Sequence, residues 1–309
     1  MSSFHIARDR SQFTWNRAIP PVIEVESGST VTLEVANASG GQLTKTSTVA
    51  DVQTLDFSRV NPVTGPIAVA HAEPGDVLII EILAIHLDEW GWTANIPGFG
   101  LLADYFPNAH LRISEVNAHY AEILHGFRIP TVPFIGTIGL ALAAPGDHPL
   151  VPPSQQGGNL DIRHVTVGSR LWLPIAVPGG LLSIGDTHAA QGDGEVAGTA
   201  IETSSTVTVR LHLKKGMRLR YPRLETHPVA ARSGRAWATT GIAPDLMVAT
   251  RDATLGMIEL ISQMTGLDPI DAYLLTSVAA DLKISEVVDM PNWVVSMHIE
   301  KDILEGATP

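Results

Sequence analysis

The sequence predicts a mainly β protein: a sandwich-like or barrel-like core with a smaller C-terminal α/β portion that contains a helical hairpin. Three observations predict this class. Short runs of alternating apolar and polar residues recur along most of the chain, 27 glycines and 21 prolines punctuate them, and two helical patterns follow near the end. Short strands between glycine- and proline-rich turns are typical of sandwiches and barrels. We expect a β-rich domain at residues 1–215 that carries the functional site, and an α/β portion at residues 216–309 that packs on it or intertwines with it.

The strands are predicted from apolar–polar alternation beside turn signals. Residues 22–26 lead through a Ser-Gly turn into residues 30–35, and a Glu-Pro-Gly-Asp turn leads into residues 77–83. Residues 205–213 alternate throughout. The side chains expected to face inward are Val31, Leu33 and Val35 in one run, and Val207, Val209, Leu211 and Leu213 in another.

Two helices are predicted from apolar spacing and capping residues. The first is expected over residues 252–265 and stops at Gly266. Asp268 and Pro269 then suit the start of a second helix, and residues 290–299 form a final strand-like run. The apolar faces are expected to be Leu255, Ile258, Ile261 and Met264 in the first helix, and Ile270, Leu274, Val278 and Leu282 in the second.

Composition narrows the class of protein. The chain of 309 residues is 45% hydrophobic and 17% charged, which is enough apolar material for a large core. Its net charge of −12 argues against nucleic acid or an anionic membrane as partner. The lack of cysteine excludes disulfides, thiolate zinc sites and a cysteine nucleophile. Because the sequence contains no signal-peptide pattern and no membrane-spanning run, we expect a cytoplasmic location.

The densest polar segment is residues 185–195, which holds acids, a histidine and several glycines. Asp186 and His188 are two positions apart, so in an extended segment their side chains point the same way and could share one metal ion. The alternative is a glycine-rich surface turn whose acids are solvated.

A second polar segment is residues 157–164. Asp161 and Arg163 alternate with apolar residues, so we expect both on one face of a strand and His164 on the other. A structural ion pair is one interpretation of this spacing. A carboxylate beside an arginine would also keep a lowered pKa, which suits a metal ligand.

A third feature is aromatic. Trp90 and Trp92 flank a glycine and could form the wall of a small pocket, or they could be ordinary core residues. The sequence has no G-x-S-x-G elbow, Walker loop, H-E-x-x-H or G-x-G-x-x-G motif. Ser183 and Ser277 leave a serine nucleophile open as an alternative.

Five stretches of the sequence stand out together: residues 72–76, 90–92 with 96–100, 158–164, 185–202, and 271–289 followed by 291–297. Together they resemble the acetamidase/formamidase family. The resemblance implies a mainly β fold, a divalent metal, and hydrolysis of short amides such as formamide and acetamide to the acid and ammonia, with relatives that open lactams. Thr187 and Ala197 stand where the family usually has glycine and cysteine, and His71 replaces a residue that is usually small. A thiol at position 197 is therefore dispensable.

The resemblance and the polar segments together give a mechanistic hypothesis. The proposed ligands of a divalent ion, zinc or alternatively calcium, are Asp161, Asp186 and His188, and the ion would activate a water molecule. Glu195, or else Asp193, would act as general base. The acids at which we expect a cation are Asp161, Asp186, Asp193, Glu195 and Glu202.

Other residues would complete the site. Gln191 or Asn159 would donate a hydrogen bond to the developing oxyanion, and Trp90 and Trp92 would limit the size of the acyl group. One alternative is a lactam or longer-amide hydrolase that uses a serine or a carboxylate without metal. Another is a non-catalytic, small-ligand-binding member of the fold. We expect a homodimer or a higher homo-oligomer.

Overall fold

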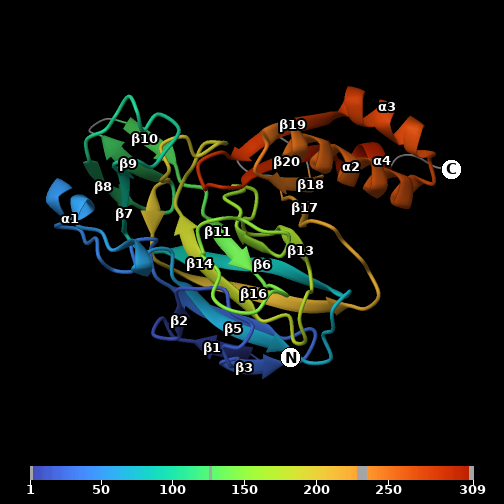
Figure 1. Cartoon of the computed structure of the whole chain (residues 1–309), viewed down its shortest axis with the longest axis horizontal. Helices are drawn as coiled ribbons and strands as arrows, with labels where there is room; N and C mark the ends of the chain where they lie inside the picture. The colour runs from blue at the N-terminus through green and yellow to red at the C-terminus, as the bar shows by residue number, and fades with distance from the viewer. Residues whose placement is uncertain (1–2, 125–126, 228–234, 306–309) are drawn as a thin grey trace.

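The computed structural model describes residues 3–124, 127–227 and 235–305. In this part of the chain two large sheets pack against each other, and the helices lie at the periphery (Figure 1). The prediction of a mainly β protein is confirmed.

The first sheet has nine strands, and it contains strands from both ends of the chain. In order across the sheet they are β1 (Ser3–Ile6), β4 (Thr30–Val35), β16 (Ser205–Lys214), β6 (Val77–Leu87), β13 (Arg170–Pro174), β17 (Arg223–Glu225), β18 (Ala236–Ala243), β20 (Trp293–Glu300) and β19 (Ala280–Glu286). Because β17 pairs with β13, residues on either side of position 215 share one sheet.

The second sheet has eleven strands and carries the site described below. Its main order is β10 (Phe127–Pro130), β9 (Tyr120–Leu124), β8 (His110–Val116), β7 (Trp90–Asn95), β15 (Glu202–Thr203), β14 (Leu182–His188), β11 (Phe134–Gly139) and β12 (Gly157–Asn159). In addition β5 (Val63–Val69) pairs with β14, β2 (Ser11–Gln12) and β3 (Ile23–Val25).

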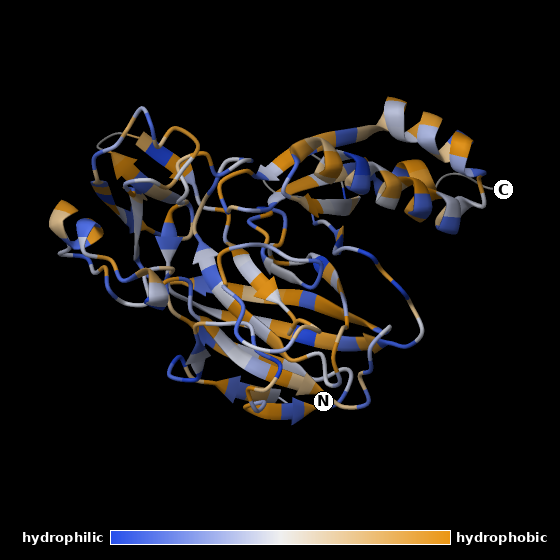
Figure 2. Cartoon of the chain, viewed as in Figure 1, coloured by the Kyte–Doolittle hydropathy of each residue, from blue (hydrophilic) through white to orange (hydrophobic). Residues whose placement is uncertain are grey.

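A large core fills the space between the sheets. Leu33 and Val209 from the first sheet and Ile138 and Ile184 from the second belong to one cluster, and each is 0% exposed. Burying an aliphatic side chain of this kind stabilises the fold by about 1.5–3 kcal/mol. The bands of apolar and polar residues that alternate along the long strands β6 and β16 are visible in Figure 2. They match the alternation seen in the sequence.

The predicted strands are confirmed with small changes of length. The run at 22–26 appears as β3, the run at 30–35 as β4, and the run at 205–213 as β16. The run at 77–83 continues to Leu87 as β6. The expected inward side chains are fully buried except Leu213, which is half-buried where β16 ends.

The two helices were predicted in the right order, the buried face of the first is only partly as expected, and that of the second is wrong. The first, α2 (Leu246–Thr265), begins earlier than expected because Asp245 caps it, accepting a hydrogen bond of 2.9 Å from the Val248 amide. Its expected residues Leu255 and Met264 are exposed. Ile261 is fully buried and Ile258 partly buried, as expected, and the other buried residues are Ala249, Asp252, Ala253, Met257 and Leu260.

The second helix, α3 (Pro269–Ala279), starts at Asp268-Pro269 as predicted, yet its apolar stripe faces outward. Ile270, Leu274 and Val278 are exposed, because α3 buries the small side chains of Ala272 and Thr276 instead. Leu282, expected on the same helix face, lies on β19.

The remaining helices are short: α1 (Val49–Gln53), the 3₁₀ helix η1 (Phe57–Arg59) and α4 (Lys301–Glu305). The described ranges contain no helix with both the length and the apolar character that crossing a bilayer requires.

Candidate active site

A cavity of about 70 Å³ opens beside the end of β14, and it has one acidic wall and one apolar wall. The acidic wall consists of Asp161, Asp186, Glu195, Glu202 and Asp289. All five side chains are at least nine-tenths buried, with exposed fractions between 1% and 8%. Buried carboxylates in this number are rare without a compensating charge.

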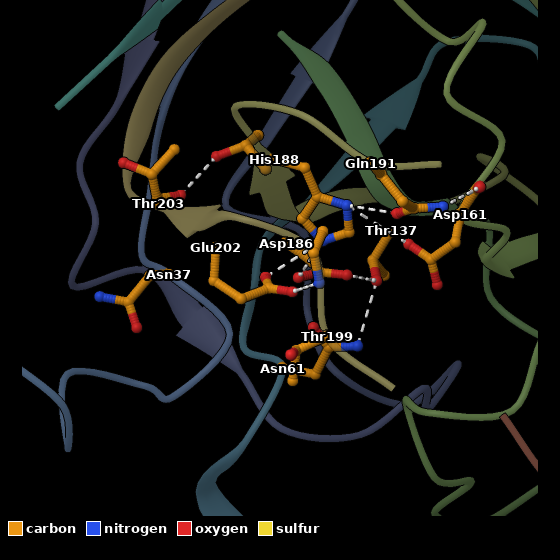
Figure 3. A network of polar contacts seen from close by, with 12 residues as sticks. Asn37, Asn61, Thr137, Asp161, Asp186, His188, Gln191, Thr199, Glu202 and Thr203 are labelled. Carbon is orange, nitrogen blue, oxygen red and sulfur yellow. Dashed lines mark hydrogen bonds and ion pairs between the residues drawn. The ribbon is translucent and has the colours of Figure 1, made fainter. Parts of the chain in front are cut away.

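The strand β14 positions two of the predicted residues. It lies inside the sheet between β11 and β15, and all of its residues are buried. Asp186 and His188 point to the same side, and His188 Nε2 lies 3.0 Å from Asp186 Oδ1 (Figure 3). Glu202 stands opposite His188 on β15, and its Oε2 lies 3.1 Å from the same Nε2. One imidazole nitrogen is therefore held between two carboxylates.

Asp161 comes from the loop that follows β12, and it faces the imidazole from the other side. Its Oδ1 lies 3.8 Å from His188 Nδ1. Neither oxygen of Asp161 receives a hydrogen bond from an N–H or hydroxyl group. Gly136 on β11 makes room for it, since a Cβ there would lie 2.5 Å from Asp161 Oδ1 and 2.7 Å from Asp186 Oδ2.

The pKa values follow from burial and from the charges that these groups share. Burial, reinforced by Asp186, raises the pKa of Asp161 to about 6, and burial raises the pKa of Glu202 to about 7. Burial also raises the pKa of Glu195 and of Asp289 well above the ordinary value.

His188 forms favourable charge pairs with both Asp186 and Glu202 in this cluster. Burial alone would raise the pKa of Asp186, but the charge and hydrogen bond of His188 lower it below its usual value. Burial likewise opposes a charge on His188, but Glu202 and Asp186 raise its pKa well above the ordinary value. One imidazolium cannot neutralise five carboxylates, so further protons or a cation must do so.

The donor set fits a divalent cation. Three overlapping groups each bring their ligand atoms within 4.8 Å of one another: Asp161, Asp186 and His188; His188, Glu195 and Glu202; and Asp161, Glu195 and Asp289. Both oxygens of Asp161, which receive no hydrogen bond from an N–H or hydroxyl group, lie in these groups. Carboxylate oxygens with one imidazole suit zinc, and an oxygen-rich set suits calcium.

The other polar residues singled out in the sequence lie nearby but are already engaged. Gln191 Oε1 lies 2.9 Å from His188 Nδ1, and Gln191 Nε2 donates to the Asp161 carbonyl. Asn159 Nδ2 donates to Asp289 Oδ2 over 2.6 Å. Both side chains therefore hold site residues in position.

Asp193 and Arg163 lie outside the acidic wall. The expectation that Asp161 and Arg163 share a strand face is wrong, because β12 ends at Asn159 and Asp161 has a positive φ of 45°. Arg163 pairs with Asp193 instead, at 3.3 Å and partly exposed. Without a guanidinium beside it, Asp161 has a raised pKa rather than the lowered one expected.

Of the aromatic and serine candidates, only Trp92 lines the cavity. Trp92 lines the cavity and donates through Nε1 to Asn37 Oδ1, whereas Trp90 lines a different hollow beside Arg8 and Phe13. Ser183 is buried and accepts a hydrogen bond from Gln12, and Ser277 lies on α3. Neither serine lines the cavity.

Sequence reasoning missed the site residues contributed by distant segments. Asp289, from the β19–β20 connection, completes the acidic wall, and the neighbouring Glu286 has its pKa raised by burial to about 8. Two acids close together in the segment 284–289, Glu286 and Asp289, were the available signal. Asn61 and Thr137 gave no signal, yet Asn61 Nδ2 donates to Asn159 Oδ1 and to Thr137 Oγ1.

The sequence is similar to those of known amidases over most of its length. The chain is 27% identical to a formamidase of Methylophilus methylotrophus over 94% of this chain and 88% of the relative. It is 30% identical to an acetamidase of Mycolicibacterium smegmatis over 65% of each chain.

Solved structures agree. A crystal structure titled a predicted acetamidase/formamidase from Thermoanaerobacter tengcongensis matches with a TM-score of 0.90 and 30% identity over 98% of this chain and 97% of that one. An acetamidase from Bacillus halodurans matches equally well, with a TM-score of 0.90 and coverage of 98% and 99%. A γ-lactamase from Delftia acidovorans has a TM-score of 0.70 at 27% identity, covering 96% of this chain and 90% of that one. The family model of acetamidases and formamidases matches residues 3–148 and 141–306, so the chain belongs to the acetamidase/formamidase family.

Proposed function

We propose that this protein is an amidohydrolase that cleaves short aliphatic amides, such as formamide or acetamide, to a carboxylate and ammonia. The observation that supports this most directly is the buried wall of carboxylates around His188, with both Asp161 oxygens lacking a hydrogen bond, in a chain of this family. Buried titratable groups with perturbed pKa values in a cavity are typical of catalytic sites.

We assign Asp161, Asp186 and His188 as the residues that hold a divalent ion, with zinc as the first candidate and calcium as the second. Such an ion would lower the pKa of a bound water from 15.7 to about 7 and polarise the amide carbonyl. Gln191 supports this assignment, because it fixes the ring of His188 through Nδ1 and is itself held by the Asp161 carbonyl.

Glu195 is the proposed general base. Burial raises the pKa of Glu195, which makes its carboxylate a stronger base than an ordinary glutamate and suits it to take a proton from water and return it to the leaving nitrogen. In the balanced reaction, the water oxygen bonds to the acyl carbon, the carbon–nitrogen bond breaks, and the nitrogen leaves as ammonia. Asp193 is a weaker candidate, because Arg163 holds it outside the acidic wall.

Lactam hydrolysis is the second candidate function. The similarity to a γ-lactamase over nearly the whole chain favours it, although the TM-score is lower than for the acetamidase structures. A non-catalytic binding protein is the remaining alternative from the sequence.

One experiment separates these functions. Release of ammonia from formamide and acetamide, and of amino acid from a γ-lactam, should be measured beside the metal content of the purified protein. We expect ammonia release with about one or two bound ions per chain. Glu195→Gln should lose most activity and keep its metal, and its matched control Asp193→Asn should keep both. Full activity in Glu195→Gln would contradict the assignment, and no release from any substrate would favour the binding protein.

We also propose that the chain forms a homodimer or a higher homo-oligomer. In support, α3 exposes Ile270, Leu274 and Val278, and β19 beside it is the last strand of its sheet. An exposed edge strand next to apolar side chains is a ready surface for pairing with a second copy.

A further inference from the structure

The apolar wall of the cavity is made by two segments that face each other. Leu55, Phe57 and Val60 come from the stretch around η1, and Ile96 and Phe99 come from the loop after β7. None of these five side chains carries a charge or a hydrogen-bonding group. The cavity therefore combines an acidic wall with an apolar wall, and the polar residues Ser39, Asn61 and Thr199 also line it.

The segment that carries Phe57 is held firmly on both sides. The Asp56 amide donates to Gln42 Oε1 over 2.8 Å, and Gln42 Nε2 donates back to the Asp56 carbonyl over 3.1 Å. After the short helix, the Asn61 amide donates to the Ala38 carbonyl over 2.6 Å. Phe57 lines the cavity and is 53% exposed to solvent, while the backbone on either side of it is held in place.

The opposite segment packs on the loop that carries Glu195. Gly198 has a φ of +80°, and a Cβ there would lie 2.5 Å from Cδ1 of Phe99. The lack of a side chain at Gly198 is what allows the ring to lie flat against this loop. The positions of the Phe57 and Phe99 segments are therefore fixed by the Gln42 side chain, by the Asn61–Ala38 backbone hydrogen bond and by the close contact at Gly198.

Resting on the proposed function, we propose that these residues form an acyl-chain pocket and that Phe57 determines the length of the chain it accepts. The carboxamide must reach the acidic wall to react, so the acyl chain is left against Leu55, Phe57 and Phe99. A charged acyl chain would lose its hydration there without gaining a partner. The short neutral amides of the proposed function fit this wall, and we place the half-exposed ring of Phe57 where a longer acyl chain would extend toward solvent.

The test compares Phe57→Ala, which opens the pocket, with Phe57→Trp, which shortens it. Ammonia release should be followed with acetamide, butyramide and hexanamide. In Phe57→Ala the ratio of kcat/KM for hexanamide to that for acetamide should rise about tenfold, and in Phe57→Trp it should fall, because each methylene in an apolar pocket is worth roughly tenfold or more. Phe106→Ala is the matched control, since its ring is 59% exposed and does not line the cavity.

Binding of acetone, 2-pentanone and 2-heptanone, measured by ligand-observed NMR, gives a second readout that needs no turnover. These ketones keep the carbonyl and the chain but have no bond to hydrolyse. If the length preference of ketone binding shifts in the Phe57 variants while no amide is cleaved, the pocket stands and the proposed function fails. If the length preferences for amides and for ketones stay unchanged in both variants, or change equally in Phe106→Ala, the pocket is overturned.

Discussion

Three acids of the site have a backbone conformation with positive φ, which residues other than glycine rarely adopt. Asp161, Asp186 and Glu195 have φ values of 45°, 52° and 44°. Each such conformation costs on the order of 1 kcal/mol, and it persists only where the surrounding structure enforces it. The buried charge adds a second cost. Stability is therefore given up at the positions where the carboxylates converge, which is the pattern expected of a functional site.

Asp161 gives the first prediction at the residue scale. Asp161→Asn removes a buried charge that burial disfavours, raising the pKa of Asp161 to about 6, so the metal-free protein at pH 8 should become more stable by about 1–3 kcal/mol. The same change should abolish ammonia release. Urea unfolding measures the first effect, with Asp193→Asn as a control expected to change stability by less than about 1 kcal/mol. A metal-free Asp161→Asn protein less stable than the wild type would refute the account of this residue.

The buried pair His164 and His298 gives a pH prediction. Their rings lie 4.8 Å apart, and burial lowers the pKa of His164 to about 4 and that of His298 well below its ordinary value. Lys283 and Arg163 oppose a charge on either ring, and Asp193 favours one on His164.

The unfolded chain protonates these two imidazoles more readily than the folded protein does. The contribution of the neutral pair to the free energy of unfolding is therefore fully present above pH 6.5 and is lost as the pH falls towards 4. His164 alone should account for about 2 kcal/mol between pH 7 and pH 5. Unfolding at several pH values measures this slope, which should be shallower in His164→Asn. Equal slopes in the two proteins would show that His164 is not the source.

At the scale of elements, the site depends on how β11 packs against β14. Gly136→Ala would place a methyl group between Asp161 and Asp186, so we expect at least about a hundredfold loss of activity in a protein that still folds. Gly192→Ala is the matched control, since a Cβ there meets nothing within 4 Å and its φ is not positive. Ammonia release and circular dichroism test this together. Near-normal activity in Gly136→Ala would mean that the two carboxylates need not converge.

The strands were predicted well from apolar–polar alternation and from turn residues, because each of these strands buries only one of its two faces. Leu33 and Val209 are examples. The prediction of the buried face of α3 was wrong for a physical reason. This helix packs through the small residues Ala272 and Thr276, which a pattern of large apolar residues cannot reveal. Ile270 and Leu274 were predicted to be buried but are exposed, because apolar character alone does not show which face of a helix packs against the rest of the protein.

At the scale of the whole molecule, the site combines segments that are far apart in the sequence. The local motif around Asp186 and His188 could be found from spacing, and Asp161 and Glu195 were found from the resemblance and from residue type. Asp289 could not be found in this way, since only the docking of the β19–β20 connection brings it to β14. The sequence also does not indicate that Asp193 lies outside the acidic wall, because residue spacing does not show that Arg163 pairs with Asp193 rather than lying beside Asp161.

The exposed stripe on α3 gives a prediction for the assembled molecule. If a second copy covers this stripe, Val278→Glu, at a side chain that is 83% exposed, should lower the molar mass measured by light scattering to that of one chain. Leu102→Glu, at a side chain 49% exposed on another surface, should leave the molar mass unchanged. A monomeric wild type, or an oligomer unaffected by Val278→Glu, would contradict this interface.

The central claim is that Asp161, Asp186 and His188 hold an ion on which amide hydrolysis depends. The most direct measurement follows ammonia release from acetamide before chelation, after exhaustive chelation, and after zinc or calcium is returned, with metal content determined at each stage. The account predicts that activity disappears with the metal and returns with it, and that Asp186→Asn neither regains metal nor recovers activity. Undiminished activity in protein whose metal content is near zero would contradict the account.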